Sequence, residues 1–524
     1  MIRASAWPSR PVAIAGATFI LLLILLGSTF HEDIKQNALS MTSRVHHEQT
    51  TLKTPVSPQK LHLLLPASEG GSDLCKTLLT GAVLGYPIPT LIAWNKTHDD
   101  GKLLGGGSHV AKISGVLDYL ESMDRADDND LVMMMDAYDI WFQLRPEVLI
   151  DRYHTINAHA NRRLTTSLGQ AKSAEGIEQK IIFGAGKRCA PNQMHTIACY
   201  PIPNSPLPDD LYGSNTDTVM GRNKYTSLKQ RYLNSGYIIG PAAEMRRLFE
   251  RAWEKAQAVK DHDDWDNGSH GSDFMYHGSD QSIFNTIFGE QEYQREVMRR
   301  RHLSLSDKAQ GRAKSKATYL EGTLITDPLS PSFTHEPGVA KEGKPDEFGI
   351  GLDYFSDLGQ QTINTDEDTH YLTYNQDINE QLKDRAKDRN DFFDCKNRVD
   401  GDLPQDVLNS RPPLTALDQQ SSWNGVSLFS NLCLNTVPVM IHHNGNKDAR
   451  HWQWTDLWIQ PHAREMMEAV RRQSDGSSTT VDGLEVATGG AHLPDGGRLS
   501  WDQLCPAEYE WTLFRDVPKP EGWP

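Results

Sequence analysis

Two aspartates follow directly on a run of apolar residues. The stretch NDLVMMMDAYDIWF occupies positions 129–142, and its apolar part, Leu131–Met135, leads straight into Asp136, with Asp139 three residues later. Two carboxylates at the end of a strand can hold a hard divalent cation such as Mg²⁺ or Mn²⁺. Such a cation can neutralise the charge on a leaving diphosphate. An Asp-x-x-Asp pattern is also common in acidic chains, where acids after strands cap turns, so both interpretations stay open.

A histidine pair stands at another expected strand end. The stretch VPVMIHHNGN predicts a strand over Val437–Ile441, so the imidazole of His442 emerges at the end of that strand, as Asp136 does. Ligands of open α/β sheets bind beyond the carboxyl ends of the strands. A neutral imidazole among the ligands suits Mn²⁺ better than Mg²⁺. The alternative is a histidine that is hydrogen-bonded within a turn.

The elements around these residues alternate between strand and helix. Continuous apolar runs predict strands that are buried on both faces, and helical spacing separates them, which is the pattern of a mostly parallel sheet with helices on its faces. The expected strands include residues 60–68, 89–95, 131–135, 180–186, 231–240, 347–360, 370–375 and 437–441. The expected helices include residues 73–86, 108–123, 242–253, 280–290 and 465–473. The sequence therefore predicts an α/β fold.

The N-terminus predicts a membrane anchor. Pro11–Phe30 holds 20 residues without a charge, and a helix of that length crosses a hydrocarbon core of about 30 Å. Arginines precede this segment and acids follow it, which predicts a type II protein with residues 1–10 in the cytosol and the rest in the lumen. A cleaved signal peptide is the alternative, although its apolar region is usually shorter. Residues 31–59 are polar and predict a stalk, residues 60–470 the main domain, and residues 471–524 a C-terminal extension.

Charge and cysteine content narrow the class of protein. Lys plus Arg is 53 and Asp plus Glu is 69, so the net charge of −16 argues against nucleic acid as the main partner. The six cysteines are an even set without a C-x-x-C pattern, which fits disulfides and disfavours a cysteine zinc site. Six cysteines allow 15 pairings, and the sequence does not choose among them. Asn95 and Asn267 begin weak N-glycosylation patterns.

Six short stretches, in order, resemble one known family. DLVMMMDAYDIWF is similar to the metal- and nucleotide-binding strand of glycosyltransferases with the GT-A fold, and most similar to the glycosyltransferase domain of the lysyl hydroxylase (procollagen-lysine dioxygenase) family. The other matching stretches are LLGGGSHVAK, IIFGAGKRCAPN, YLNSGYIIG, SDQSIF and IHHNGN. Together they span about residues 60–460. Residue by residue, the chain departs from the family pattern at the single Asp280 in place of a run of acids, at a displaced Lys112, and at His443 in place of a glycine.

The resemblance implies a GT-A-like, Rossmann-like fold and a role for each matching residue. It implies that Asp136, Asp139 and His442 bind Mn²⁺ and that the ring of Tyr138 stacks on the uracil of a UDP-sugar. Three further roles are implied, for Lys112 near the diphosphate, Asn234 lining the cleft, and Asp280 near the sugar and acceptor as the best candidate for a general base. An ordinary structural role at a strand-to-turn position explains Asn234 nearly as well as a role in the site. Asp280 has an alternative too, because the dipole at a helix N-terminus favours an acid there.

These implications define the expected function. We expect a metal-dependent transferase that moves galactose or glucose from a UDP-sugar to a hydroxyl of a glycoprotein or glycan, in the Golgi or endoplasmic reticulum. The main alternative is a non-catalytic lumenal protein that kept the fold and binds nucleotide-sugar or glycan. A metal-dependent phosphoesterase is a second alternative, but a two-metal site calls for more clustered acids and histidines. Fold alone does not decide among them.

Overall fold

The computed structural model describes residues 59–521 with internal gaps. The gaps are residues 101–102, 214–215, 218–223, 261–277, 312–328, 330–346, 384–394, 396–398, 418, 475–479, 482–483 and 486–488. The expected anchor, its flanking tail and nearly all of the stalk lie outside the described residues, as does Asn267. Among the described residues, no helix combines the length and the apolar character that crossing a membrane requires.

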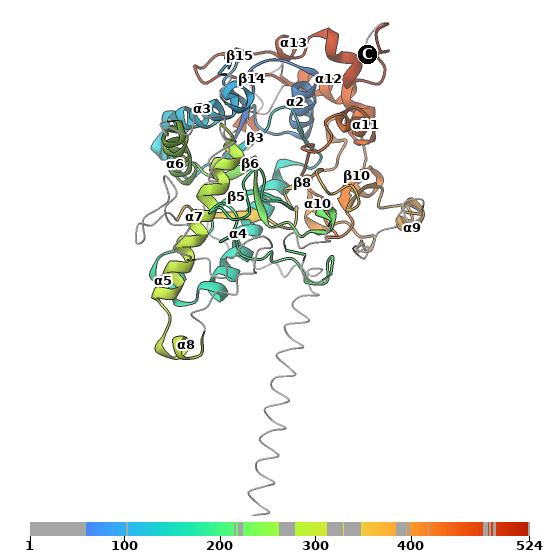
Figure 1. The fold of residues 1–524 in the computed structure, drawn as a ribbon. Coiled ribbons are helices and arrows are strands. Elements are labelled where there is room, and N and C mark those ends of the chain that lie inside the picture. The colour runs from blue at the N-terminus through green and yellow to red at the C-terminus, as the bar shows by residue number, and fades with distance from the viewer. Residues whose placement is uncertain are drawn as a thin grey trace, which may run out of the picture. The chain divides into compact units, whose positions relative to one another are not determined.

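A large mixed sheet forms the centre of the described part of the chain (Figure 1). Its eight strands, in spatial order, are β15 (Arg498–Leu499), β14 (Ala491–His492), β2 (Thr90–Ile92), β1 (Leu61–Pro66), β3 (Leu131–Met135), β6 (Tyr232–Pro241), β5 (Ile181–Gly186) and β7 (Ile350–Asp353). The pairings β14–β2, β2–β1, β1–β3 and β5–β7 are parallel, whereas β6 runs opposite to both β3 and β5, and β15 opposite to β14. The expected α/β class with a mostly parallel sheet is therefore confirmed.

Helices cover both faces of this sheet because its strands are apolar on both sides. Successive residues of β1 and β3 enter two different cores: Leu63 and Met133 pack in one, Leu64 and Met134 in the other. The first core also holds α2 (Ser72–Leu84), α4 (Pro146–Leu168) and α12 (Ala463–Ser474). The second holds α3 (Ser108–Ser122), α6 (Ala242–Lys260) and α7 (Asp280–Arg301), which lie together on one side of Figure 1.

A three-stranded sheet continues from the end of β3 and carries the expected histidine. It consists of β4 (Ile140–Phe142), β11 (Met440–His442) and β8 (Gly359–Gln361), with β11 antiparallel to β4 and parallel to β8. The strand expected over Val437–Ile441 begins later, at Met440. In this register His442 lies opposite Ile140, which is the residue after Asp139. The short sheet thus connects the segment of the aspartates to the segment of the histidine.

The remaining described elements are short. Two separate two-stranded sheets pair β9 (Thr369–Leu372) with β10 (Leu428–Asn431) and β12 (Thr480–Val481) with β13 (Leu484–Glu485). The strand expected near residues 370–375 therefore lies outside the main sheet. The other helices are α5 (Gln170–Ala174), α8 (Leu305–Ala309), α9 (Ile378–Gln381), α10 (Gln405–Asn409), α11 (Ala449–Asp456), α13 (Trp501–Leu504) and α14 (Glu510–Leu513).

Three disulfides pair all six cysteines. Cys75 bonds to Cys505, Cys189 to Cys199, and Cys395 to Cys433. The first joins α2 to the segment after α13, and β14 and β15 of the same C-terminal segment extend the main sheet. The described part of residues 471–524, expected as an extension, is thus built into the domain. Such pairing is typical of proteins that fold in an oxidising compartment.

Candidate metal centre

The structure brings Asp136, Asp139 and His442 together. The Nε2 atom of His442 lies 3.8 Å from Oδ2 of Asp136 and 3.7 Å from Oδ1 of Asp139. One ligand atom from each residue lies within 4.8 Å of the others. The short turn between β3 and β4 holds both aspartates, and the pairing of β4 with β11 places the histidine against them. Two backbone hydrogen bonds fix the arrangement, from the Asp136 amide to Gly236 O and from the His443 amide to Asp139 O.

The spacing and chemistry of this trio fit a divalent cation. Distances of 3.7 and 3.8 Å are too long for hydrogen bonds. Three ligand atoms, each about 2.1 Å from one ion, would lie about 3–4 Å from one another. Oδ1 of Asp139 is buried and has no hydrogen-bond partner among the described residues, so a bound cation would satisfy it. Two carboxylates and one imidazole are a donor set that suits Mn²⁺.

Electrostatics also favour a cation at this position. Burial raises the pKa of the Asp139 carboxyl, His442 opposes that shift, and the charge of Asp136 adds to it. The net result is a raised pKa, because burial and the charge of Asp136 outweigh the positive charges of His442, Lys447 and Arg450. A divalent cation bound to Asp139 would favour the ionised form of its carboxyl. The second trio of possible ligands, Asp368 with Cys395 and Cys433, is excluded because both cysteines are in a disulfide.

Gly236 leaves the space that the His442 imidazole occupies. A Cβ atom on residue 236 would lie 2.0 Å from Cε1 of His442, far inside van der Waals contact. The same glycine accepts the hydrogen bond from the Asp136 amide. The glycine of the Leu-Asn-Ser-Gly stretch therefore supports two candidate ligands at once. Sequence reasoning singled out Asn234 from this stretch and missed Gly236, although a glycine in a strand often marks a close approach.

Lys112 is an internal counter-ion between two carboxylates. Its Nζ lies 2.6 Å from Oδ1 of Asp136 and 3.0 Å from Oδ2 of Asp280, and its side chain is only 8% exposed. Burial alone would lower the pKa of Lys112, but the charges of Asp136 and Asp280 outweigh burial and raise it. The lysine is therefore held as a cation beside the candidate metal ligands. Its expected place near a diphosphate is compatible with this position.

Asp280 is held as an anion. It begins α7, and its side chain accepts hydrogen bonds from Ser235 Oγ at 3.0 Å and from His109 Nδ1 at 2.9 Å, besides the ion pair with Lys112. Burial would raise the pKa of Asp280, but Lys112 and His109 outweigh burial and lower it far below the usual range. A carboxylate with so low a pKa accepts a proton poorly near neutral pH. The geometry thus favours a charged, orienting role over the expected role of general base.

Asn234 and Gln281 organise the strand next to the candidate metal ligands. Oδ1 of Asn234 accepts a hydrogen bond from the Gly236 amide at 3.1 Å. Oε1 of Gln281 accepts hydrogen bonds from the Ser235 amide at 2.8 Å and from Ser235 Oγ at 3.0 Å. Asn234 is partly exposed and lies beside the cluster without being one of its ligands. Its contacts are those of a residue that shapes the local backbone.

Tyr138 lies between the two aspartates and is tied to the end of β1. Its hydroxyl accepts hydrogen bonds from the backbone amides of Ser68 and Glu69 at 3.1 and 3.2 Å and donates to Glu69 O at 3.0 Å. The tyrosine is partly buried, with its ring packed against the first core. The hydroxyl contacts fix the side chain at the carboxyl edge of the sheet, where ligands of such folds bind.

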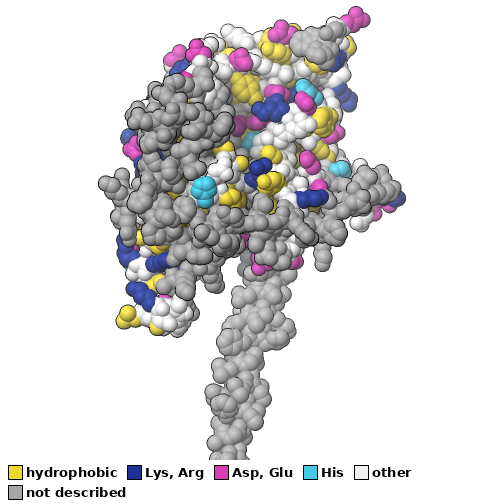
Figure 2. Space-filling view, viewed as in Figure 1, with side chains coloured by type: hydrophobic (Ala, Val, Ile, Leu, Met, Phe, Trp, Pro, Cys, Tyr) yellow, Lys and Arg dark blue, Asp and Glu magenta, His cyan; other side chains and the backbone are white. Residues whose placement is uncertain are grey.

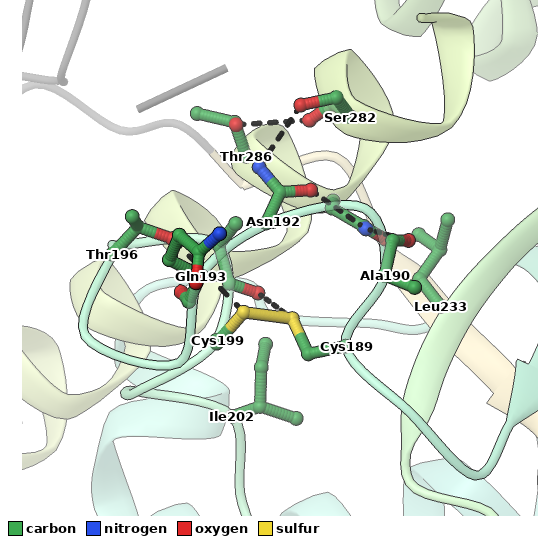
Figure 3. Close-up of a disulfide and its surroundings, with 12 residues drawn as sticks. Cys189, Ala190, Asn192, Gln193, Thr196, Cys199, Ile202, Leu233, Ser282 and Thr286 are labelled. Atoms are coloured by element: carbon green, nitrogen blue, oxygen red, sulfur yellow. Dashed lines mark hydrogen bonds between the residues drawn. A yellow bond between two sulfur atoms is a disulfide. The ribbon is translucent and has the colours of Figure 1, made fainter. Parts of the chain in front are cut away.

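A disulfide-closed loop supports the start of α7 (Figure 3). The loop runs from Cys189 to Cys199 and follows β5. Nδ2 of Asn285 donates to Ala190 O at 3.0 Å and to Oδ1 of Asn192 at 2.9 Å, while Oδ1 of Asn285 accepts from Gln281 Nε2 at 3.1 Å. Sequence reasoning missed Asn285, because nothing in its local pattern distinguishes it. Its contacts link the loop to the residues beside the candidate metal ligands.

Charged side chains of both signs share one face of the protein. In the space-filling view, acidic and histidine side chains lie near lysine or arginine side chains in the described part of the face shown (Figure 2). Comparisons of the chain with known protein families and with curated proteins find no match.

Proposed function

We propose that this protein is a metal-dependent glycosyltransferase with a GT-A-like fold, which moves a hexose from a UDP-sugar to a hydroxyl of a glycoprotein or glycan. The observation that carries the proposal is the meeting of Asp136, Asp139 and His442 at the carboxyl edge of a mostly parallel sheet. These residues come from two segments about 300 positions apart, and both stretches resemble the same family. Galactose and glucose are the proposed sugars by that resemblance.

Different residues of the candidate site would serve different parts of such a reaction. Asp136, Asp139 and His442 would hold Mn²⁺, which when bound acts as a Lewis acid on the leaving diphosphate. The charge of Lys112, already fixed next to Asp136, adds positive potential on the same side. The ring of Tyr138, fixed by its hydroxyl, would offer a flat face to the uracil. Asn234 and Gln281 keep the neighbouring strand in place.

The N-terminal segment and the disulfides bear on the compartment in which the protein would act. We propose that the N-terminal apolar segment anchors the protein in the Golgi or endoplasmic reticulum, with the described domain in the lumen. The pairing of all six cysteines supports an oxidising compartment.

The test is donor turnover by the full-length chain produced in a secretory host. UDP release is measured from a panel of UDP-sugars with Mn²⁺ and with EDTA, for the wild type, for Asp139→Asn, and for Asp502→Asn as a control. Asp502 is an acid on α13 whose side chain is 70% exposed. We expect Mn²⁺-dependent release from one UDP-sugar that is lost in Asp139→Asn and kept in the control.

Two other outcomes would change the proposal. Mn²⁺-dependent UDP binding without any release would favour the non-catalytic nucleotide-sugar-binding protein. Neither binding nor release, in a folded protein, would remove the metal assignment of Asp136, Asp139 and His442 and the transferase proposal with it.

A further inference from the structure

A histidine and a buried carboxylate form a pair beside the metal centre. His109 is the second residue of α3, and its Nδ1 lies 2.9 Å from Oδ1 of Asp280 at the start of α7. The side chain of Asp280 is 4% exposed, whereas that of His109 is 42% exposed. The second ring nitrogen of His109, Nε2, has no hydrogen-bond partner among the described residues. One nitrogen is thus anchored inside the protein, and the imidazole itself reaches the surface.

The carboxylate decides which nitrogen carries the proton. Oδ2 of Asp280 is occupied by Lys112 and Ser235, and its Oδ1 faces His109. The pKa of Asp280 is lowered, since the charge of Lys112 and the contact with His109 outweigh burial. An ionised carboxylate only accepts hydrogen bonds, so Nδ1 of the neutral imidazole must donate and Nε2 keeps its lone pair. A histidine whose tautomer and orientation are fixed by a buried carboxylate is the arrangement of a general base.

The pair is joined to the candidate metal centre through one lysine. Nζ of Lys112 contacts Asp280 on one side and Asp136 on the other, at 3.0 and 2.6 Å. Lys112 lies one helical turn after His109 on α3, so both side chains leave the same face of the helix. The buried carboxylate, the lysine and the metal ligand therefore form one continuous row, with the half-exposed imidazole at its outer end.

We propose that His109, oriented by Asp280, is the general base that deprotonates the acceptor hydroxyl; this inference rests on the proposed transferase function. In the step, the acceptor oxygen forms a bond to the anomeric carbon while the bond from that carbon to the UDP oxygen breaks. The electron pair of the broken bond leaves with UDP, and the hydroxyl proton moves to Nε2 of His109. A base on the acceptor serves a single in-line displacement, so the anomeric configuration inverts. Asp280 is then a positioning residue.

The experiment replaces the imidazole and keeps its anchor. In His109→Asn the amide nitrogen can still donate to Asp280, but no lone pair of a ring nitrogen remains. We expect kcat for sugar transfer to fall about 10²–10⁴-fold, as loss of a general base does. The KM for the donor and the affinity for UDP with Mn²⁺, measured by calorimetry, should stay within about twofold. The matched control is His154→Asn, an exposed histidine on α4, which should leave all of these values unchanged.

Any other result would overturn the role of His109 alone or both proposals together. A kcat for His109→Asn within about twofold of the wild type, or a product of retained configuration by NMR, would overturn the role of His109 and leave the transferase proposal standing. If His109→Asn lost affinity for UDP as well as kcat, His109 would belong to the donor site or would support the fold. It would then not be the general base. A wild-type protein that neither binds UDP with Mn²⁺ nor releases it would overturn both proposals together.

Discussion

At the scale of single residues, the closest approach in the site is that of Gly236 to His442. Any side chain on residue 236 competes with the imidazole for the same space, since a Cβ would lie 2.0 Å from Cε1. The histidine can move only by leaving the two aspartates, because its backbone is fixed in β11 between β4 and β8. The candidate metal centre therefore depends on a residue that carries no functional group.

We expect Gly236→Ala to weaken Mn²⁺ binding about 10–100-fold, the usual range when a group that orients a metal ligand is changed. The matched control is Gly71→Ala, because a Cβ on residue 71 would have no atom within 4 Å and the backbone there is extended. Calorimetric titration with Mn²⁺ measures both variants. Unchanged affinity in a folded Gly236→Ala protein would show that His442 is not a ligand.

Lys112 makes a second prediction at this scale. Lys112→Met keeps the length of the side chain but leaves Asp136 and Asp280 without their shared cation. Breaking a buried ion pair in this way costs about 3–5 kcal/mol in the free energy of unfolding. Lys180→Met is the control, because Lys180 pairs with Glu244 at 2.6 Å but is 43% exposed, so its loss should cost less than about 1 kcal/mol.

Mn²⁺ provides a further check on Lys112→Met. A divalent cation next to Asp136 should restore part of the lost stability, so thermal unfolding should shift upward with Mn²⁺ more in Lys112→Met than in the wild type. An equal shift in both proteins would mean that Lys112 and the metal ion do not both interact with the charge of Asp136. Chemical denaturation with and without Mn²⁺ measures the free energies of unfolding of both proteins.

At the scale of elements, the first turns of α7 are set by their neighbours. The Cys189–Cys199 loop packs on one side through Asn285, and Gly289 passes so close to Ile197 O that a Cβ would lie 1.9 Å from it. On the other side Gln281 binds the backbone of β6 at Leu233 and Ser235. The helix start, and with it Asp280, is therefore placed by a loop and a strand that are distant in sequence.

Asn285→Ala should loosen this contact. The change removes the donor to Ala190 O and Asn192 and leaves buried polar groups unpaired, each at a cost of about 1–3 kcal/mol. We expect a lower free energy of unfolding and faster hydrogen exchange in the first turns of α7. Asn409→Ala, an exposed position at the end of α10, should change neither quantity. Equal effects of the two variants would contradict the role given to Asn285.

At the scale of the whole molecule, the C-terminal segment closes the domain. Strand β14 pairs with β2 at the edge of the main sheet, the Cys75–Cys505 disulfide ties the segment to α2, and Trp501 and Leu504 are buried in the first core. Removing the segment would expose both the β2 edge and an apolar surface, and exposed strand edges promote aggregation.

A chain that ends after Ser474 should therefore be recovered poorly and unfold at a lower temperature, whereas a chain that ends after Lys519 should behave as the wild type.

The double change Cys75→Ser with Cys505→Ser isolates the disulfide, and we expect it to lower the free energy of unfolding by about 3–5 kcal/mol. Size-exclusion chromatography and thermal unfolding test the three proteins. A monomeric, equally stable product of the Ser474 truncation would contradict the closing role.

The sequence by itself determined the class of fold and the position of the main candidate residues. The sequence contains apolar runs long enough for buried strands, and segments with helical spacing separate them. Together they predict a layered α/β fold, because both patterns depend only on residues that are close together in the sequence. Asp136 and His442 could be singled out because each follows an apolar run at an expected strand end, and Asp139 because it lies three residues after Asp136. The reversed direction of β6 and the separate sheet of β9 and β10 were not visible, because pairing partners are chosen by packing and not by local pattern.

Only the tertiary structure decided what these residues contact. It chose one of the 15 cysteine pairings, built the C-terminal segment into the sheet, and placed Lys112 between two carboxylates. It also paired His109 with Asp280, 171 positions apart, which turned the expected base into an anion that orients a histidine. The physical reason is that ionisation, burial and metal affinity depend on atoms within a few ångströms, and those atoms come from segments that the chain brings together only when it folds.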